Sequence, residues 1–242
     1  MNLLITICAR GGSKGLKNKN ILPIKSVPLI GYSILCAEKI AKALPDSKVD
    51  IELSTDSKKI IDVAEQFNLR TQYLRPDFLA SDSAGKVAAI EDLLNYSETS
   101  RNMRYDFILD LDVTSPLRTL DDILPALGIL ISHEEALNLV SVSRAHKSPY
   151  FNMLEIEDSG FARLVMARSE EILSRQAAPK VYDMNASFYI YRREFFDLAV
   201  KSAITTKTLA HEISHLCFDV DTKDDFLFME YLITHNKLEF DL

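Results

Sequence analysis

The feature that most constrains the fold is an apolar strand sequence that runs directly into a basic loop containing glycines. Residues 3–8 (Leu-Leu-Ile-Thr-Ile-Cys) have the composition of a parallel strand buried on both faces. Residues 9–20 then place Gly11, Gly12 and Gly15 among four cationic side chains. Glycines let several backbone N–H groups converge on one anion, and Arg and Lys neutralise its charge. The sequence therefore predicts a phosphate-binding loop with enough cations for a polyphosphate.

The loop matches neither of two common nucleotide-binding patterns. It lacks the G-x-x-x-x-G-K-[ST] spacing of a Walker A loop and the G-x-G-x-x-G spacing of dinucleotide-binding folds. We therefore interpret it as a nucleoside triphosphate site of another kind. A basic surface turn is the alternative, although such turns rarely follow an N-terminal buried strand directly.

Composition and charge narrow the class of ligand. The chain of 242 residues is long enough to bury a substantial core, and its 28 basic and 35 acidic residues give a formal net charge of −7. A nucleic-acid binder that ignores base sequence needs a basic surface, so this balance argues against a nucleic-acid partner. The cationic loop is a local cluster on an acidic protein, which favours a small anionic ligand.

The sequence predicts a cytoplasmic protein with no membrane partner. Met1 leads into the first strand without a signal-peptide pattern, and no apolar stretch approaches the ~18 residues of a membrane span. Cys8, Cys36 and Cys217 are widely spaced among apolar neighbours. This arrangement is typical of buried thiols in a reducing compartment rather than of disulfides or a metal site.

Hydrophobic periodicity alternates between strands and helices through about the first 145 residues. We expect strands at residues 3–8, 49–53, 71–74, 107–112 and 139–142, and helices at 28–44, 60–67, 87–96 and 121–131. This β-α-β-α-β-α-β-α-β order predicts a doubly wound, mainly parallel, Rossmann-like sheet with right-handed crossovers. In such sheets ligands bind beyond the carboxyl ends of the strands.

The pattern breaks between about residues 144 and 183, which are polar, irregular and short of long apolar periods. We interpret this stretch as an inserted arm or lid. Order returns with an expected strand at 186–191, a helix at 194–200, a strand at 216–218 and a closing helix. The sequence thus predicts one domain over residues 1–242 with an arm at about 144–183.

Two pairs of carboxylates lie at predicted strand ends. Asp219 and Asp221 flank one apolar residue, so strand alternation sends both side chains to one face, where they can share a hard cation such as Mg²⁺. Helix capping by Asp221 or Thr222 is the alternative, and it explains only one of the two carboxylates. Asp110 and Asp112 repeat the spacing on another strand. We expect Asp110 to be buried against a partner and Asp112, at the strand tip, to be functional.

Two further segments at the predicted carboxyl edge carry polar groups. Thr114, Ser115 and Arg118 offer two hydroxyls and a cation on a rigid turn, which suits a polar anionic ligand. Arg75 precedes a loop at residues 79–86 that is rich in small residues, and these allow a planar base to approach the backbone. Helix capping by Ser and Asp is the competing explanation for that loop.

Residues 211–215 (His-Glu-Ile-Ser-His) match the H-E-x-x-H signature of zinc peptidases. That chemistry needs the motif within a long helix and a third ligand, for which Glu230 or Glu239 would have to serve. Here the motif adjoins an expected strand and a turn. We therefore interpret both histidines as surface or core residues.

Taken together, these segments resemble the acylneuraminate cytidylyltransferases, enzymes that make CMP-activated nonulosonic acids of the sialic acid type. The matching segments follow the family's order and span nearly the whole chain, at residues 9–15, 19–20, 54–56, 75–76, 79–82, 114–118, 175–176, 185 and 219–222. The resemblance implies a fold of the nucleotide-diphospho-sugar transferase type with a small inserted dimerisation arm. It also implies a reaction in which CTP and a 2-keto sugar acid give a CMP-sugar and pyrophosphate.

The resemblance implies roles for individual residues. The implied nucleotide site comprises Arg10, Gly11, Gly12, Ser13, Lys14, Asn20, Arg75, Ala84 and Lys86. The implied acceptor site comprises Asp112, Thr114, Ser115, Arg118, Arg175, Gln176, Asp183 and Asn185. The implied catalytic residues are Arg10, Lys14, Asn20, Asp219 and Asp221, of which the last two would bind Mg²⁺ and so orient the α-phosphate for in-line attack. The family is usually a homodimer whose arm reaches the partner's site, which makes Arg175 a candidate for the sugar carboxylate.

Two positions depart from the sialic-acid-specific pattern. Such members commonly have Gln-Pro before Thr-Ser-Pro-Leu-Arg, where this chain has Asp112 and Val113. They commonly have Arg-Pro-Asn-Gly where residues 183–186 are Asp-Met-Asn-Ala. We therefore expect a different acceptor, such as legionaminic or pseudaminic acid. A sister nucleotidylyltransferase for 3-deoxy-manno-octulosonate or another acceptor, and a non-catalytic nucleotide-binding protein, stay open as alternatives.

Overall fold

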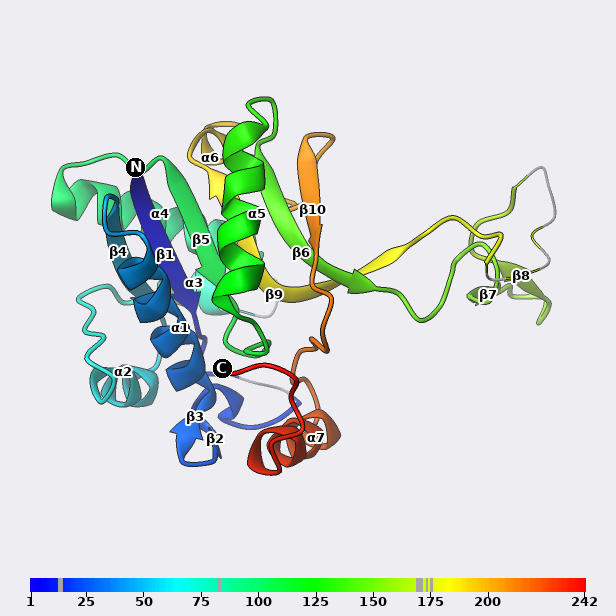
Figure 1. Cartoon of the computed structure of the whole chain (residues 1–242), viewed down its shortest axis with the longest axis horizontal. Helices are drawn as coiled ribbons and strands as arrows, with labels where there is room; N and C mark the ends of the chain where they lie inside the picture. Colours follow the sequence, from blue (N-terminus) through cyan, green and yellow to red (C-terminus); the bar gives the residue numbers. More distant parts are fainter. Residues whose placement is uncertain (13–14, 82–83, 169–171, 173, 175) are drawn as a thin grey trace.

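A computed structural model of the chain describes residues 1–12, 15–81, 84–168, 172, 174 and 176–242. Within these residues a central sheet has the strand order β10-β6-β9-β5-β1-β4 (Figure 1). Its strands are β1 (Asn2–Cys8), β4 (Lys48–Ser54), β5 (Phe107–Leu111), β6 (Asn138–Arg144), β9 (Tyr182–Arg192) and β10 (Thr208–Glu212). All run parallel except β9, which is antiparallel to its neighbours β5 and β6. The predicted mainly parallel α/β fold is confirmed.

Strand β1 lies at the centre of the parallel part of the sheet, as its apolar sequence predicts. Leu3 pairs with Val49 of β4 on one side and with Phe107 of β5 on the other. Because these strands are parallel, their carboxyl ends meet at one edge of the sheet. The basic loop, the end of β4 and the end of β5 therefore converge at this carboxyl edge.

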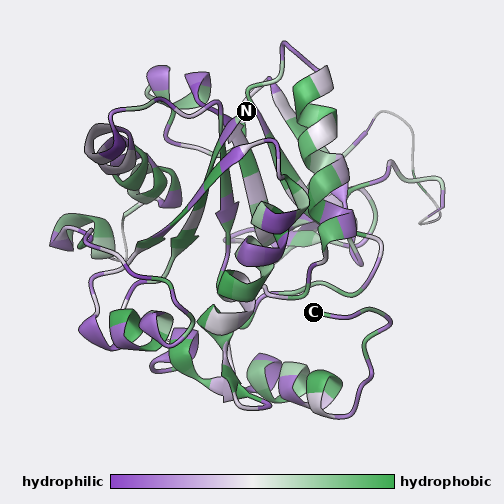
Figure 2. Ribbon diagram, turned by 60° about the vertical axis from the view of Figure 1, so that its left-hand side comes forward, coloured by the Kyte–Doolittle hydropathy of each residue, from purple (hydrophilic) through white to green (hydrophobic). Residues whose placement is uncertain are grey.

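Helices cover both faces of the sheet. Helices α1 (Leu29–Ala43) and α5 (Leu120–Ser132) lie on one face, and α4 (Lys86–Arg101) and α6 (Glu194–Asp197) lie on the other (Figure 1). Alternate residues of β1 feed the two cores, with Leu3 and Ile5 in the first and Leu4 in the second. The helix ribbons mix hydrophobic and hydrophilic residues, as amphipathic covering helices do (Figure 2).

The remaining elements surround the carboxyl edge. They are the 3₁₀ turn η1 (Lys19–Ile21), the short strands β2 (Pro23–Ile24) and β3 (Val27–Pro28), and helices α2 (Lys58–Glu65), α3 (Asp77–Ala80) and α7 (Lys223–Thr234). Thr222 caps α7 through a capping box with Asp225. None of the helices in the described ranges is long and apolar enough to cross a membrane.

An arm extends from the body between the end of β6 and the start of β9 (Figure 1). It carries a hairpin of β7 (Leu154–Ile156) and β8 (Ala162–Leu164). Leu154, Ile156 and Phe161 expose 60%, 79% and 76% of their surface, respectively. Apolar side chains this exposed on a projecting hairpin mark a surface suited to an interface.

Two expected strands are wrong, and the strands β2, β3, β7, β8 and β10 were not expected. Residues 71–74 are irregular, and Thr71 bonds to β4 through its side-chain Oγ1, which donates to the carbonyl of Leu53 at 3.4 Å. Residues 216–218 are irregular too, because they are tied down by side-chain bonds such as Ser115 Oγ to the carbonyl of Phe218 at 3.2 Å. Neither contact is a backbone ladder. The unpredicted strand β10 is a half-exposed edge strand with little apolar alternation.

Candidate active site

A cavity of about 510 Å³ opens at the carboxyl edge of the sheet. Its walls come from the basic loop, the segment from Arg75 to Ser81, the start of α4, the end of β5 and the loop before α7. The lining residues are Cys8, Arg10, Gly15, Lys19, Asn20, Arg75, Leu79, Ser81, Ala84, Gly85, Lys86, Ala89, Asp112, Thr114 and Asp221. Segments far apart in the sequence therefore meet where the strand order predicts a ligand site.

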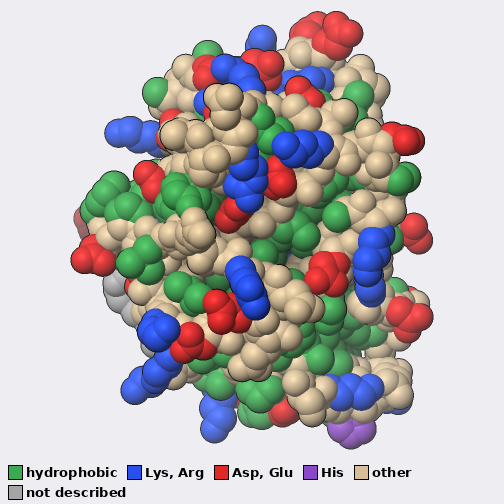
Figure 3. All heavy atoms as spheres, turned by 90° about the vertical axis from the view of Figure 1, so that its left-hand side faces the viewer, with side chains coloured by type: hydrophobic (Ala, Val, Ile, Leu, Met, Phe, Trp, Pro, Cys, Tyr) green, Lys and Arg blue, Asp and Glu red, His purple; other side chains and the backbone are tan. Residues whose placement is uncertain are grey.

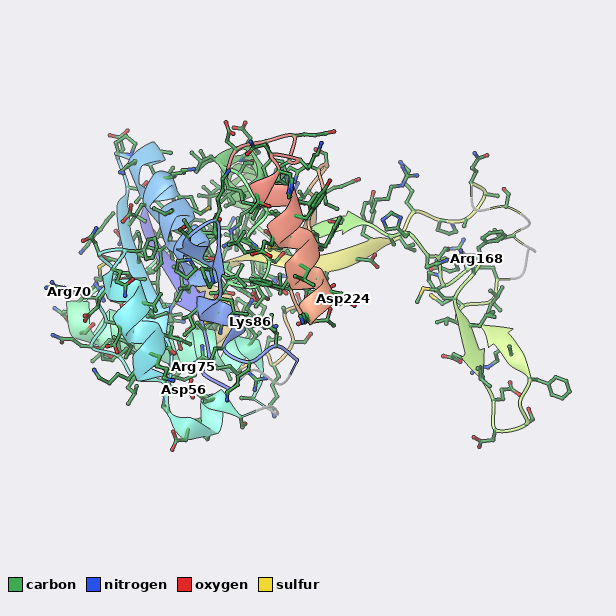
Figure 4. The ribbon with its side chains drawn as sticks, turned by 90° about the horizontal axis from the view of Figure 1, so that it is seen from below. Asp56, Arg70, Arg75, Lys86, Arg168 and Asp224 are labelled. Carbon is green, nitrogen blue, oxygen red and sulfur yellow. The ribbon has the colours of Figure 1, made fainter. Side chains whose placement is uncertain are left out.

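Charges are dispersed on one face of the molecule. On the face shown in Figure 3, Lys and Arg side chains are interspersed with Asp and Glu. Figure 4 places Lys86 and Arg75 in the body of the molecule and Arg168 on the arm, away from them.

Hydrogen bonds fix the basic loop at its two ends. The backbone N–H of Gly11 donates to Asp56 Oδ1 at 2.7 Å, and a Cβ at Gly11 would lie 2.9 Å from the Cβ of Ser57. Asn20 is buried, and its Nδ2 donates to the carbonyl of Arg10 at 3.0 Å. Asn20 therefore holds the loop backbone in position. The predicted phosphate ligands Ser13 and Lys14 lie outside the described residues.

The basic loop is also fastened to the loop that carries Asp219 and Asp221. Lys19 Nζ donates to the carbonyl of Val220 at 2.8 Å and pairs with Asp221 Oδ1 at 2.9 Å. A Cβ at position 15 would lie 2.3 Å from the carbonyl oxygen of Asp221, so only glycine permits this approach. The cationic and acidic segments are thus held side by side.

The carboxylates of Asp219 and Asp221 lie close enough for their negative charges to repel each other. Burial raises the pKa of Asp219, and the neighbouring charge of Asp221 raises it further. Mg²⁺ is bound in proteins by one or two carboxylates, with waters and substrate phosphates completing its shell. A divalent cation would offset the repulsion between the two carboxylates, so this donor set fits the predicted metal. Thr222 supplies the helix cap, which leaves both carboxylates outside that role.

Arg75 is nearly buried in the cavity wall. Its Nε donates to Ser54 Oγ at 2.8 Å and its Nη2 to the carbonyl of Ser54 at 2.9 Å. These bonds to the end of β4 fix the plane of the guanidinium. Ala84 and Gly85 line the cavity close by and present little side chain.

Lys86 lies between two carboxylates of β5 and the loop after it. Its Nζ is 2.9 Å from Asp110 Oδ2 and 2.6 Å from Asp112 Oδ2, and it lies 4.5 Å from the ring centroid of Tyr189. Burial opposes ionisation of Asp112, but Lys86 and the hydrogen bonds from Thr114 outweigh it and lower the pKa of Asp112 to about 2. Burial alone would lower the pKa of Lys86, but the charges of Asp110 and Asp112 outweigh burial and raise this pKa well above its usual value. Lys86 and Asp112 therefore stay charged at neutral pH.

Ser115 and Arg118 lie beneath the cavity rather than among the residues that line it. Ser115 is fully buried, and its Oγ donates to the carbonyl of Asn185 at 2.9 Å. Arg118 Nη1 donates to the carbonyls of Asp112 and Ser115, both at 2.9 Å. The Nη2 of Arg118 donates to Ser33 Oγ at 2.7 Å. These bonds brace the backbone that presents Asp112 and Thr114 to the cavity.

The other predicted acceptor residues lie on or near the arm. Asn185 is buried at a bulge of β9, where its Oδ1 accepts from Ser141 Oγ at 2.6 Å and its Nδ2 donates to Ser143 Oγ at 2.9 Å. Asp183 is exposed on β9, and Gln176 is exposed on the arm. Arg175 lies outside the described residues. The structure therefore does not bring Gln176, Asp183 or Asn185 into the cavity of the same chain.

Sequence reasoning missed several lining residues, among them Cys8, Lys19, Leu79 and Ser81. Lys19 carried a usable signal because it belongs to the basic loop. Cys8 carried none, and burial raises its pKa to about 12, so that it remains a thiol. The part played by Asp110 as a partner of Lys86 was also missed, because strand alternation does not tell which cation meets a buried carboxylate.

The H-E-x-x-H sequence does not form a peptidase site. His211 and Glu212 end strand β10, and the rest of the motif is irregular, whereas zinc peptidases place it on a helix. His215 Nε2 lies 2.9 Å from Asp122 Oδ2, and its ring packs on Phe240. Among the residues that the structure describes, no group of three or more His, Cys, Asp or Glu side chains is arranged to hold a metal.

The sheet order and the site at its carboxyl edge define a nucleotidyltransferase-type α/β fold. The chain is similar to CMP:2-keto-3-deoxy-manno-octonic acid synthetase complexed with CTP, with a TM-score of 0.70 and 14% identity over 98% of this chain and 100% of that one. It is also similar to 4-diphosphocytidyl-2C-methyl-D-erythritol synthase from Anaerococcus prevotii, with a TM-score of 0.60 and 12% identity over 96% and 98%. At these identities the likeness establishes the fold.

Sequence comparison establishes the family. Residues 4–239 match the cytidylyltransferase family, and the chain belongs to it. It is 37% identical to post-translational flagellin modification protein B of Campylobacter coli and 35% identical to CMP-N,N'-diacetyllegionaminic acid synthase of Campylobacter jejuni, in each case over 98% of this chain and 97% of the relative. It is 32% identical to an N-acylneuraminate cytidylyltransferase of Streptococcus agalactiae, over 96% of this chain and 55% of that one. The predicted family and nucleotidyltransferase class are confirmed.

Proposed function

We propose that this cytidylyltransferase joins CTP to a nonulosonic acid of the legionaminic type, giving a CMP-sugar and pyrophosphate. The single observation that carries the proposal is the cavity itself. It sets the cationic loop with Arg10 and Lys19 against Asp221 on one side, and presents Asp112 and Thr114 on the other. One side suits a metal-bound triphosphate and the other suits a hydroxylated acceptor. The names of the full-length relatives support an acceptor of this class.

In the proposed reaction the anomeric hydroxyl of the acceptor attacks the α-phosphorus of CTP. A new phosphorus–oxygen bond forms to the sugar as the bond to pyrophosphate breaks, and the proton of the attacking hydroxyl is released to water. Arg10, Ser13 and Lys14 hold the triphosphate and offset charge on the leaving pyrophosphate. Asn20 positions the loop through the carbonyl of Arg10. Asp219 and Asp221 would hold Mg²⁺, which supplies charge neutralisation at the phosphate oxygens.

The nucleotide and acceptor would meet over the floor of the cavity. We assign Arg75 and the segment from Ala84 to Lys86 to the base and ribose, with the glycines of the basic loop at the phosphates. We assign Asp112 and Thr114 to the acceptor. Because Ser115 Oγ, Nη1 and Nη2 of Arg118, and Nδ2 of Asn185 donate within the framework, we assign these three side chains to positioning that backbone.

We propose that the enzyme is a homodimer that works in the cytoplasm. The exposed apolar side chains of the arm support the dimer. In it the arm would bring Arg175, Gln176 and Asp183 to the partner's cavity, where Arg175 would bind the sugar carboxylate. The three cysteines are free thiols, which fits a reducing compartment.

The experiment measures pyrophosphate release from CTP and Mg²⁺ with purified protein and a panel of acceptors. The panel contains N,N'-diacetyllegionaminic, pseudaminic, N-acetylneuraminic and 3-deoxy-manno-octulosonic acids. We expect the highest kcat/KM with a diamino nonulosonate, and little release with ATP, GTP or UTP. A highest kcat/KM with N-acetylneuraminic acid would refute the acceptor assignment, whereas release with 3-deoxy-manno-octulosonate alone would support the sister enzyme.

A further inference from the structure

Asp110 is a fully buried carboxylate on β5, in the middle of the sheet and not among the residues that line the cavity. Its Oδ1 accepts a hydrogen bond from Thr6 Oγ1 at 2.8 Å, and Thr6 is itself fully buried. A buried charge is costly unless it is paired, and here the pair is completed by Lys86 Nζ at 2.9 Å from Oδ2. The buried carboxylate therefore fixes where the lysine ammonium lies on the cavity floor.

The fixed ammonium in turn lies beside a second carboxylate that reaches the cavity. The side chains of Lys86 and Asp112 are 30% and 20% exposed, respectively, and both line the cavity. An ammonium has three N–H donors; Lys86 gives one to Asp112 Oδ2 and lies within ion-pair distance of Asp110 Oδ2, 2.9 Å away. Asp112 Oδ1 is occupied by the N–H and Oγ1 of Thr114, both at 2.8 Å, while Oδ2 receives Lys86 and keeps acceptor capacity. The cavity floor therefore offers one donor and one acceptor side by side.

This pairing excludes several kinds of ligand group. Asp110, Lys86 and Asp112 together carry a net charge of −1, so they do not attract a phosphate or a carboxylate. A trans amide points its N–H and C=O in opposite directions and so cannot use both groups at once. Two hydroxyls on adjacent carbons, in contrast, lie about a hydrogen bond's length apart. One can donate to Asp112 Oδ2 while the other accepts from Lys86.

We propose that the Lys86–Asp112 ion pair, held in place by Asp110, binds a vicinal diol and makes the enzyme selective for it. Lys86 and Asp112 contact the ligand, whereas Asp110 is a positioning residue. Lys86 was assigned above to the nucleotide and Asp112 to the acceptor, and their ion pair places them at the boundary between the two. The diol therefore has two sources: the ribose of the nucleotide, which Asp112 would then also contact, and the hydroxylated chain of the acceptor, which Lys86 would then also contact. If the diol belongs to the acceptor, the inference rests on the proposed function. If it belongs to the ribose, the inference requires only that the enzyme binds a cytidine nucleotide.

The test pairs ligand and side-chain changes. Calorimetry compares the binding of CTP, 2'-deoxy-CTP and 3'-deoxy-CTP, and turnover compares two acceptors that differ by one hydroxyl of an adjacent pair. We expect loss of one hydroxyl to weaken wild-type binding or kcat/KM by roughly 10- to 100-fold for one of the two sources, because the hydroxyl bonds to charged groups. In Asp112→Asn and Lys86→Met the same loss should shrink to about 3-fold or less.

Controls separate this role from a structural one. Asp110→Asn should also lower the discrimination between ligands with and without the diol. Pyrophosphate carries no diol, so its affinity for this variant should stay unchanged and serves as the control. Lys58→Met removes an exposed ion pair with Asp62 at 3.4 Å, far from chemistry, and should leave the discrimination intact. Thermal melting identifies any variant that fails to fold. If Lys86→Met or Asp110→Asn fails to fold, the result for the isosteric variant Asp112→Asn tests the proposal.

The outcomes are separable from those of the proposed function. If the weaker binding of a deoxy-CTP relative to CTP is lost in Asp112→Asn, the diol belongs to the ribose. If instead the lower kcat/KM of the acceptor that lacks one hydroxyl is lost in this variant, the diol belongs to the acceptor. Full discrimination retained in Asp112→Asn and Lys86→Met overturns the proposal. If no nonulosonate is turned over, the proposed function fails, but the comparison of CTP with the two deoxy-CTPs still tests the diol proposal. Equal binding of all three nucleotides would in that case overturn the diol proposal.

Discussion

Replacing Arg118 by Met removes a guanidinium that is buried beneath the active-site cavity. Arg118 is 2% exposed, and it donates to the carbonyls of Asp112, Ser115 and Ser187 and to the hydroxyl of Ser33. Methionine matches much of the side-chain length but offers no donor. Arg118→Met therefore leaves the carbonyls short of a donor without opening a large cavity.

The expected loss of stability follows from what each acceptor keeps. Asp112 O retains Ser33 Oγ at 3.2 Å, Ser115 O retains Ser187 Oγ at 3.3 Å, and Ser187 O retains the N–H of Asp112 at 3.1 Å. Because each carbonyl keeps a second donor, the low end of the usual range applies, at about 1 kcal/mol for each bond. Arg118→Met should lower the free energy of unfolding by about 3–4 kcal/mol.

Urea unfolding followed by circular dichroism measures this loss, and steady-state kinetics measures its effect on turnover. Arg104→Met is the matched control, because Arg104 is 61% exposed and pairs with Asp197 at the surface, where such pairs contribute about 0–1 kcal/mol. A variant of Arg118 as stable as the wild type, with a raised KM for the acceptor alone, would contradict the reasoning. Arg118 would then contact substrate, as the sequence resemblance implies.

Four other perturbations test separate parts of the account. Gly15→Ala should lower kcat/KM by more than tenfold with little loss of fold, because its Cβ would meet the carbonyl of Asp221; an active variant would contradict the close approach. Asp219→Asn should stabilise the metal-free protein at neutral pH, since ionising a carboxyl of raised pKa opposes folding as the pH rises through that pKa. In thermal melts, Mg²⁺ should stabilise the wild type more at pH 7 than at pH 4.5. Asp219→Asn should abolish this stabilisation by Mg²⁺. Asp112 has a lowered pKa of about 2, so it contributes about 2 kcal/mol above pH ~4 that is lost as the pH falls toward 2, and acid titration of Asp112→Asn should lack that part. If the proposed dimer forms through the arm, Ile156→Glu should convert it to monomers in sedimentation velocity, and a persistent dimer would show that the hairpin is not the interface.

The sequence predicted the layers of the fold well, because burial imposes periodicity. Strand β1 alternates between the two cores, and helices α1, α4 and α5 carry apolar stripes toward the sheet. The convergence of the basic loop and Asp112 on one cavity also followed from strand order, whereas Arg75 and Asp221 reach it from irregular segments where strands were expected. Parallel strands bring their carboxyl ends together whatever the details of the loops.

What the sequence did not reveal is where a polar side chain sends its hydrogen bonds. Ser115, Arg118 and Asn185 match a binding motif, yet Ser115 Oγ, Arg118 Nη1 and Asn185 Nδ2 donate to backbone carbonyls or other side chains within the framework. Asp110 was expected to be buried, but its partner Lys86 comes from a helix 24 positions earlier in the chain. Such pairings depend on tertiary geometry that no spacing rule contains. The short edge strand β10 escaped for a related reason, since half-exposed residues show little periodicity.

The most direct test of the central claim is ³¹P NMR of the wild-type enzyme with CTP, Mg²⁺ and N,N'-diacetyllegionaminic acid. We predict that the three CTP resonances disappear together while pyrophosphate and one new phosphodiester resonance grow in equal amounts. Unchanged CTP, or pyrophosphate without an equal amount of the phosphodiester, would contradict the transfer of a cytidylyl group to this class of acceptor.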